Sequence, residues 1–197
     1  RLSAISDRLI ATGLDMILHH YDAPLASRAQ LVAVHDSAYV DEIHAAAPRQ
    51  GIAWVDGDTA MNPHSLTAAL RAAGAVTLGV DLVMSGRAKQ VFCAVRPPGH
   101  HAERHRAMGF CFFNNIAVGA LHAIHEHGVE RVAIVDFDVH HGNGTEDIVA
   151  GNEHILFCST FQHPFYPNSG FGQTAENVVN TPLTSGTSSL VFREAIE

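Results

Sequence analysis

Residues 131–145 read RVAIVDFDVHHGNGT, an apolar stretch that ends in carboxylate and imidazole side chains. The apolar residues 132–135 predict a central strand that is buried on both faces of a parallel sheet. Because successive side chains of a strand alternate sides, Asp136, Asp138 and His140 share one face. Carboxylate oxygen and imidazole nitrogen both bind zinc at about 2.0–2.2 Å, so the Asp-x-His pair suits a divalent metal. A charged strand end that enters a loop would show the same spacing.

The composition is that of a single α/β domain. The chain has 197 residues, and its 47% hydrophobic content is enough to bury a substantial core. A net charge of −8 without any basic block argues against direct nucleic-acid binding and suits cationic substrates. No apolar run approaches the roughly 20 residues that span a bilayer, and no signal peptide is visible, so no membrane association is expected.

The cysteines are odd in number and show no C-x-x-C spacing: Cys93, Cys111 and Cys158. This pattern argues against a disulfide framework and against a cysteine zinc site. It favours a reducing compartment, and we expect a cytoplasmic protein.

Helical and strand patterns alternate along the chain, which predicts a parallel sheet with helices on its faces. Asn62-Pro63 predicts the start of a long helix that Gly86 ends. A second helix is expected over residues 115–127, closed by Gly128. The side chains expected to face the core are those of Ile116, Leu121 and Ile124. The side chains expected to face solvent are those of His122, His125 and His127. Strands are expected at residues 90–95, 132–135, 155–158 and 178–183, and a helix begins near residue 188.

Three polar segments follow predicted strands: residues 97–101, 136–143 and 159–170. Ligands of open α/β sheets bind beyond the carboxyl ends of the strands, so the three segments are expected to form one site. Adjacent His100 and His101 can serve one site only on an irregular loop, which the preceding Pro-Pro-Gly stretch supplies. The two imidazoles are therefore candidates for acid and base groups.

Three long, ordered motifs carry a resemblance to a known family. They are RPPGHHAERHRAMGFCFFNNIAVGA at 96–120, VAIVDFDVHHGNGTEDI at 132–148 and FCSTFQHPFYPNSG at 157–170. They resemble the zinc-dependent histone deacetylase superfamily, which includes acetylpolyamine amidohydrolases. The resemblance implies the arginase/deacetylase fold, a three-layer α/β/α sandwich with a mainly parallel central sheet. It also implies that residues 1–197 are the larger, N-terminal part of one such domain, incomplete at the C-terminal side.

By position, the resemblance implies a metal site on the strand quoted above. Asp138 and His140 would be two of three zinc ligands. Backbone carbonyls near Asp136, Asp138 and His140, together with Ser159, resemble the family's monovalent-cation site, so K⁺ is a further expected cofactor.

The resemblance also assigns the tandem histidines. His100 would pair with Asp136 and act electrostatically, and His101 would pair with Asn143 and act as the general base that later protonates the leaving amine. Some family members carry Asp where this chain has Asn143. A neutral amide does not raise the imidazole pKa by charge, which leaves His101 better poised as a base near neutral pH.

Substrate-binding residues are expected at the entrance of the site. Phe110 and Tyr166 match aromatic residues that line the family's narrow acyl-lysine channel, next to Gly109; ordinary core packing of the rings is the alternative. Asp58 matches an acidic rim residue that orients the substrate backbone, although a turn-forming Asp is the simpler interpretation.

The activity that the resemblance implies is zinc-dependent removal of an acetyl or other acyl group from lysine side chains or polyamines. Expected partners are acetylated lysine peptides or proteins, or acetylpolyamines. The family's third zinc ligand, an Asp, and its oxyanion-stabilising Tyr or His come from a later segment, so we expect the 197 residues alone to be inactive or nearly so. Two alternatives are a module that binds acyl-lysine without cleaving it, and a two-manganese ureohydrolase, which Asn143 and the tandem histidines disfavour.

Overall fold

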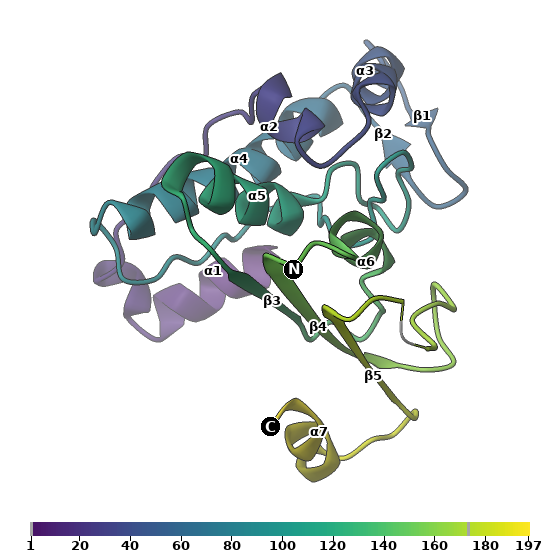
Figure 1. The fold of residues 1–197 in the computed structure, drawn as a ribbon. Coiled ribbons are helices and arrows are strands. Elements are labelled where there is room, and N and C mark those ends of the chain that lie inside the picture. Colours follow the sequence, from purple (N-terminus) through teal and green to yellow (C-terminus); the bar gives the residue numbers. More distant parts are fainter. Residues whose placement is uncertain (1, 173) are drawn as a thin grey trace.

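A small parallel sheet lies at the centre of the fold. The structure, a computed structural model, describes residues 2–172 and 174–197. The strands β3 (Val132–Asp136), β4 (Ile155–Gln162) and β5 (Val178–Leu183) lie in the order β3-β4-β5 and are parallel (Figure 1). Their register places Asp136 beside Ser159, so polar side chains meet at the carboxyl edge of the sheet.

The other regular elements of the described structure are helices and one short antiparallel hairpin. Their bounds are α1 Leu2–Ala11, η1 Leu14–Met16, α2 Arg28–Val32, α3 Ser37–Ala46, β1 Ala53–Trp54, β2 Ala60–Met61, α4 Ser65–Met84, α5 Asn115–His127, α6 Asn143–Val149 and α7 Ser189–Ile196. Helices α5 and α6 lie on one side of the sheet in Figure 1, and α7 lies on the other side. The core includes Phe113, Ile134 and Phe157. The predicted α/β class with a parallel sheet is confirmed.

The strand predictions are only partly correct. The strands predicted at 132–135 and 178–183 are present, and the one at 155–158 extends further, to Gln162. Residues 90–95 form no strand, because their backbone pairs with no neighbouring strand. The amide of Val95 instead donates to the carbonyl of Cys93. Apolar composition predicts an extended segment, but only a partner strand makes it part of a sheet.

The apolar run of β3 predicted a central strand that is buried on both faces, but β3 lies at the edge of the described sheet and one of its faces is exposed. Ile134 is 5% exposed and points into the core, whereas Val135 is 56% exposed and Phe137 beyond the strand is 72% exposed. The alternation continues to His140, so Asp136, Asp138 and His140 do share the inward side. A continuous apolar run shows that both faces can be buried, but the packing of the other elements decides whether they are.

Helix α4 is the longest helix and starts two residues after the predicted site. It begins at Ser65 rather than Pro63, because Asn62 makes a turn in which its Oδ1 accepts from the amide of His64 at 2.8 Å. With 20 residues it is long and apolar enough to cross a membrane, contrary to the expectation that no such run exists. Its buried face of small residues packs against α5, which explains the apolar composition.

Helix α5 has the predicted bounds, and its buried face differs from the prediction in part. The side chain of Asn114 caps its first turn by accepting from the amide of Ala117 at 3.1 Å, and Gly128 ends it in the left-handed region. Ile116 is 42% exposed, contrary to the prediction, whereas Leu121 and Ile124 pack against the core as predicted, together with buried small residues around Gly119. The reason is close helix packing, since a Cβ on Gly119 would lie 2.3 Å from Cγ1 of Val76 on α4.

The three histidines of α5 also differ from the expectation that all face solvent. His125 is exposed. The side chains of His122 and His127 are only 9% and 26% exposed, because both contact Asp81 of α4. Helical periodicity places them away from the sheet, but it does not show that a second helix lies there.

A buried imidazole connects the N-terminal helices to the start of α5. His35 is 3% exposed; its Nδ1 lies 2.9 Å from the carbonyl oxygen of Glu103, and its Nε2 accepts from the amide of Asn114 at 2.9 Å. The carbonyl needs a donor and the amide needs an acceptor, so the ring is neutral with its proton on Nδ1. Burial lowers the pKa of His35 to about 4, and the hydrogen bond to Glu103 opposes only part of this effect.

Acidification is therefore expected to destabilise the protein through His35. Below pH 6.5 the unfolded chain binds a proton that the folded state resists, so the free energy of unfolding falls as the pH decreases towards 4. The difference between these pKa values corresponds to a loss of about 3 kcal/mol in the free energy of unfolding, at about 1.36 kcal/mol per pKa unit. Urea unfolding at pH 7 and pH 4.5 should show a His35→Gln variant less stable than wild type at pH 7, with the gap narrowing at pH 4.5. The exposed His125→Gln substitution is the control, and a gap that does not change with pH would contradict the assignment.

Candidate active site

The predicted site residues meet in one cavity at the carboxyl edge of the sheet. The cavity has a volume of about 270 Å³. Its lining consists of Asp58, Pro98, His100, His101, Gly109, Phe110, Asp138, His140 and Tyr166. All of these except Pro98 were singled out from the sequence, and they come from four separate segments of the chain. The three predicted segments do contribute to one cavity, but only two of them follow strands, because residues 90–95 form none.

His101 is held in one tautomer by a chain of hydrogen bonds. The Nδ2 of Asn143 donates to Oε1 of Glu103 at 2.7 Å, so the amide oxygen of Asn143 faces Nδ1 of His101, 2.8 Å away. An amide oxygen only accepts, so the imidazole proton is on Nδ1 and the lone pair is on Nε2. Burial, followed by the charge of His100, lowers the pKa of His101 to about 4, which leaves the ring neutral near pH 7.

His100 lies against His101 and has its own carboxylate partner. The ring centroids of the two histidines are 4.0 Å apart, and Nδ1 of His100 is 2.8 Å from Oδ2 of Asp136. The other oxygen of Asp136 accepts from the amide of Asp138 at 3.0 Å, which fixes the carboxylate. Both contacts expected for the tandem histidines, His100 with Asp136 and His101 with Asn143, are present.

Asp138 and His140 place two metal-binding atoms side by side. Oδ1 of Asp138 lies 2.9 Å from Nδ1 of His140 and accepts from the amide of His140 at 2.9 Å. Burial acts to raise the pKa of Asp138, but the His140 amide and the charge of His100 outweigh it, so the pKa is lowered. An ionised carboxylate oxygen and an imidazole nitrogen are donors that zinc accepts. The pair fits a zinc ion, with two ligands from the described residues of this cavity.

The cavity entrance is formed by a loop whose backbone is tied to the Asp58 turn. The amide of Gly109 donates to Oδ1 of Asp58 at 3.0 Å, and the amide of Phe110 donates to Oγ1 of Thr59 at 3.0 Å. These bonds hold Phe110 at a positive φ of 65°, which is unusual for a residue with a bulky side chain. Asp58 is thus a turn residue and also lines the cavity.

Both aromatic rings lie at the cavity. Phe110 is 60% exposed, which rules out ordinary core packing for this ring. The ring of Tyr166 stands edge-on to His101, with centroids 5.2 Å apart. Burial and the neighbouring Asp58 carboxylate raise the pKa of Tyr166, so its hydroxyl stays protonated.

Ser159 lies beneath the site and has an unusual hydroxyl. Its side chain is buried, and its Oγ has no hydrogen-bond partner within the described structure. A buried polar atom without a partner costs about 1–3 kcal/mol. A cation that accepts this oxygen as a ligand would remove the cost, and the position beside Asp136 fits the expected K⁺ site.

Two residues of the site were not identified from the sequence. Glu103 orients the Asn143 amide, and Phe165 stacks on His140 with ring centroids 5.0 Å apart. Both belong to the motifs quoted above, but their residue types alone carry no specific signal. Their contacts join segments 40 and 25 residues apart, which spacing along the chain does not reveal.

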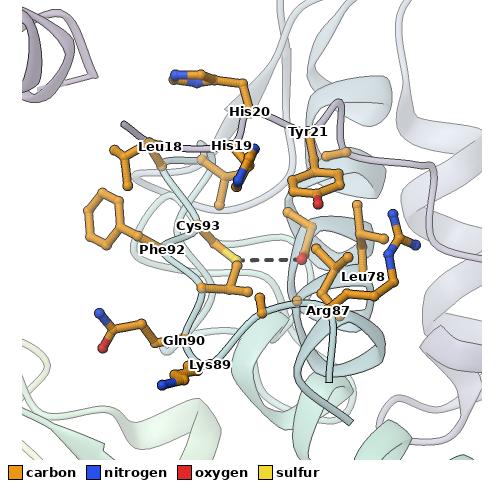
Figure 2. Close-up of a pocket in the computed structure, with 18 of the residues that line it drawn as sticks. Leu18, His19, His20, Tyr21, Leu78, Arg87, Lys89, Gln90, Phe92 and Cys93 are labelled. Atoms are coloured by element: carbon orange, nitrogen blue, oxygen red, sulfur yellow. Dashed lines mark hydrogen bonds between the residues drawn. The ribbon is translucent and has the colours of Figure 1, made fainter. Parts of the chain in front are cut away.

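A larger cavity of about 630 Å³ lies elsewhere. Figure 2 shows it between the segment around Tyr21, helix α4 and the extended residues 87–95. Most of its lining is aliphatic or aromatic, and Sγ of Cys93 donates to the carbonyl of Ala75 at 3.4 Å. None of the site residues predicted from the sequence lines it.

Known proteins are similar to this chain in fold and in sequence. The crystal structure of the HDA15 HD domain superimposes with a TM-score of 0.88 at 37% identity, covering 94% of this chain and 55% of that one. The histone deacetylase domain family matches residues 1–197. The chain therefore belongs to the histone deacetylase family.

Two curated relatives are longer than this chain. The histone deacetylase-like amidohydrolase of Pseudomonas aeruginosa is 35% identical over 206 residues, which cover 100% of this chain and 53% of that protein. A probable deacetylase of Archaeoglobus fulgidus is 35% identical over 182 residues, covering 87% and 50%. The chain spans about half the length of these relatives.

Gly109 is expected to be essential for the position of His101. A Cβ at Gly109 would lie 2.3 Å from Cδ2 of His101, so Gly109→Ala must displace the imidazole. Gly51 has a similar positive φ of 71° but nothing within 4 Å of its Cβ position, which makes Gly51→Ala a matched control for backbone strain alone. In urea unfolding, Gly109→Ala should cost about 1–3 kcal/mol more than Gly51→Ala. Only Gly109→Ala should shift the NMR signals of the His101 ring; equal effects of the two variants would contradict the contact.

Proposed function

We propose that the intact protein is a zinc-dependent amidohydrolase that removes an acetyl or other acyl group from lysine side chains or polyamines. One observation carries the proposal: the free Nε2 of a neutral His101 shares a cavity with the metal-binding pair Asp138 and His140. Relatives named as deacetylases support the same reaction type.

Asp138 and His140 would hold the zinc ion. When bound, zinc polarises the acyl carbonyl and lowers the pKa of water, which supplies a nucleophile at neutral pH. A catalytic zinc commonly has three protein ligands, and the described residues of the cavity contribute two. By the family resemblance, the third ligand would be an Asp from a later segment of the domain.

The chain's own residues would move the proton. Nε2 of His101 accepts a proton from the attacking water and then delivers it to the leaving amine. Asn143 keeps the other ring nitrogen protonated, so Nε2 alone is available as a base. His100, paired with Asp136, contributes electrostatically to the developing charge.

The entrance would bind the substrate. Phe110 and Tyr166 offer apolar walls for the aliphatic chain of an acyl-lysine or acylpolyamine. The carboxylate of Asp58 lines the cavity. There it would accept a hydrogen bond from a backbone amide of a peptide, or attract a cationic polyamine. Acetylated lysine peptides and acetylpolyamines are therefore the two substrate classes to compare.

Catalysis is expected to depend on His101 and on the metal pair. Acetate release by the intact protein from an acetyl-lysine peptide and from an acetylpolyamine should fall about 10²–10⁴-fold in His101→Ala. It should be abolished by a chelator or by Asp138→Asn, whereas His125→Ala on the exposed face of α5 should leave it unchanged. Activity indifferent to His101 and to chelation would refute the proposal. Calorimetric binding of acetyl-lysine without acetate release would instead identify a binding module.

The Ser159 site is expected to bind K⁺. In wild type the melting temperature should be higher in potassium chloride than in choline chloride at equal ionic strength, because a bound ion stabilises only the folded state. Ser159→Ala removes the unpaired oxygen and should reduce this difference, while the exposed Ser3→Ala should retain it. A difference that persists in Ser159→Ala would show that the cation acts elsewhere.

A further inference from the structure

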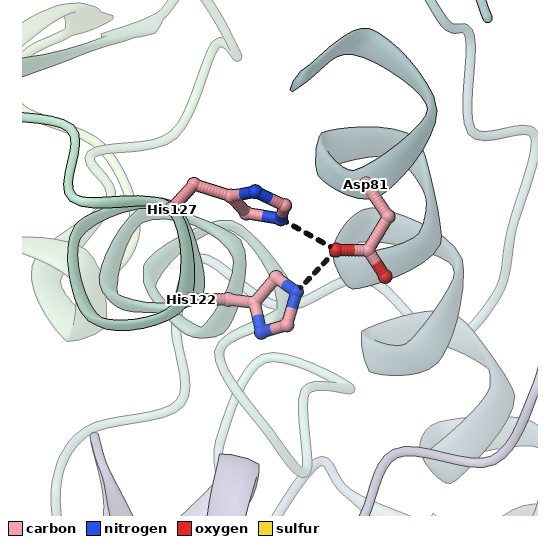
Figure 3. A group of neighbouring side chains, drawn as sticks. All are labelled: Asp81, His122 and His127. Atoms are coloured by element: carbon pink, nitrogen blue, oxygen red, sulfur yellow. Dashed lines mark hydrogen bonds and ion pairs between the residues drawn. The ribbon is translucent and has the colours of Figure 1, made fainter. Parts of the chain in front are cut away.

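A second group of metal-ligand side chains connects helices α4 and α5. Oδ1 of Asp81 lies 2.7 Å from Nε2 of His122 and 2.7 Å from Nε2 of His127, as Figure 3 shows. The three donor atoms lie within 4.8 Å of one another. Three possible ligands from two helices thus converge on one point.

The fold explains why these side chains meet. The close contact between Gly119 and Val76 brings α5 against α4, so the last turns of α5 pass the carboxylate of Asp81. His122 and His127 are five residues apart, which corresponds to about 140° around a helix of 3.6 residues per turn. The two rings therefore approach Asp81 from different directions, as ligands of one ion must.

This group is separate from the candidate active site. The active-site end of α5 is Asn115, whose Nδ2 donates to the carbonyl of Pro97 at 3.1 Å. His127 is the last residue of the same helix, about 18 Å further along the axis at 1.5 Å per residue. The two sites can therefore be perturbed independently.

The donor set determines the class of ion. Two imidazole nitrogens and one carboxylate oxygen suit borderline divalent metals, with Zn²⁺ as the common biological choice. Adjacent ligands around a tetrahedral ion at about 2.0 Å are about 3.3 Å apart, so the side chains must separate by about 0.6 Å from their present contacts. Asp81 has room to move, since its side chain is 49% exposed.

The local electrostatics are compatible with a cation. Burial acts to raise the pKa of Asp81, but the hydrogen bonds from His127 and His122 outweigh it, so the pKa is lowered and the carboxylate is ionised. Among the described residues, Asp81 forms its ion pairs with these two histidines rather than with Lys or Arg. A metal ion would take the place of the protons on the two Nε2 atoms, which are released to solvent from a charged ring or move to Nδ1 in a neutral one. No permanent positive charge would have to be displaced.

We propose that Asp81, His122 and His127 form a binding site for Zn²⁺ or a similar divalent transition metal, which links α4 to α5. The ion completes its coordination with water, because Asp81 is half exposed. The site has a structural role: it stabilises the packing of the two helices and takes no part in the reaction proposed above.

The proposal can be tested apart from catalysis. In the intact protein, Asp138→Ala and His140→Ala remove the candidate active-site ligands, and the metal-stripped double variant is then dialysed against Zn²⁺. About one equivalent of zinc per chain should remain, measured by elemental analysis. Adding His122→Gln or Asp81→Asn should remove it, whereas adding His125→Gln, an exposed histidine of the same helix, should not. Two different ligand substitutions are used because His122 is largely buried and its replacement could affect folding.

Thermal unfolding supplies a second readout. Zinc at about 100 times its dissociation constant should raise the melting temperature by about 5–11 °C, and this rise should disappear in Asp81→Asn. Failure of the double variant to retain zinc, or retention that Asp81→Asn does not change, would overturn the proposal. In that case the three side chains form a hydrogen-bonded group only.

Discussion

Parallel pairing of β3 with β4 is the interaction on which the site depends. It aligns the carboxyl ends of the two strands, so Asp136 stands beside Ser159, and the segment that follows β3 accepts a backbone hydrogen bond at Val139 from Gln162 of β4. Asp138 and His140 lie on this segment, on the same side as Ile134 in the core. The metal-binding pair is therefore positioned by the backbone hydrogen bonds of the sheet and by the burial of one strand face.

The histidine loop is held against this edge by polar contacts over long sequence distances. His100 is bonded to Asp136, and His101 to Asn143, at 2.8 Å in both cases. In each imidazole, Nδ1 is thus bonded to a side chain of β3 or α6, and Nε2 is not part of that bond. The close approach at Gly109 limits the movement of the His101 ring, so the sheet edge, the loop and the entrance are mechanically coupled.

The two ends of helix α5 contact different groups of polar side chains. At its first turn, Asn114 caps the helix and Asn115 bonds Pro97 near the tandem histidines. At its last turns, His122 and His127 meet Asp81 of α4. The small residues between them allow α4 and α5 to pack closely, so one helix supplies contacts to two separate regions.

The sequence by itself determined the α/β class and the bounds of α5, because strand alternation and helix capping are local properties. Its ordered motifs also indicated most residues of the candidate site, although not Glu103 or Phe165. His100, His101, Asp138 and His140 could be placed at one sheet edge for that reason. It could not determine that residues 90–95 join no strand, that Val135 is exposed, or that Asp81 lies between His122 and His127. Those outcomes depend on which surfaces pack together, and only the tertiary structure decides which partner each apolar face and each polar atom finds.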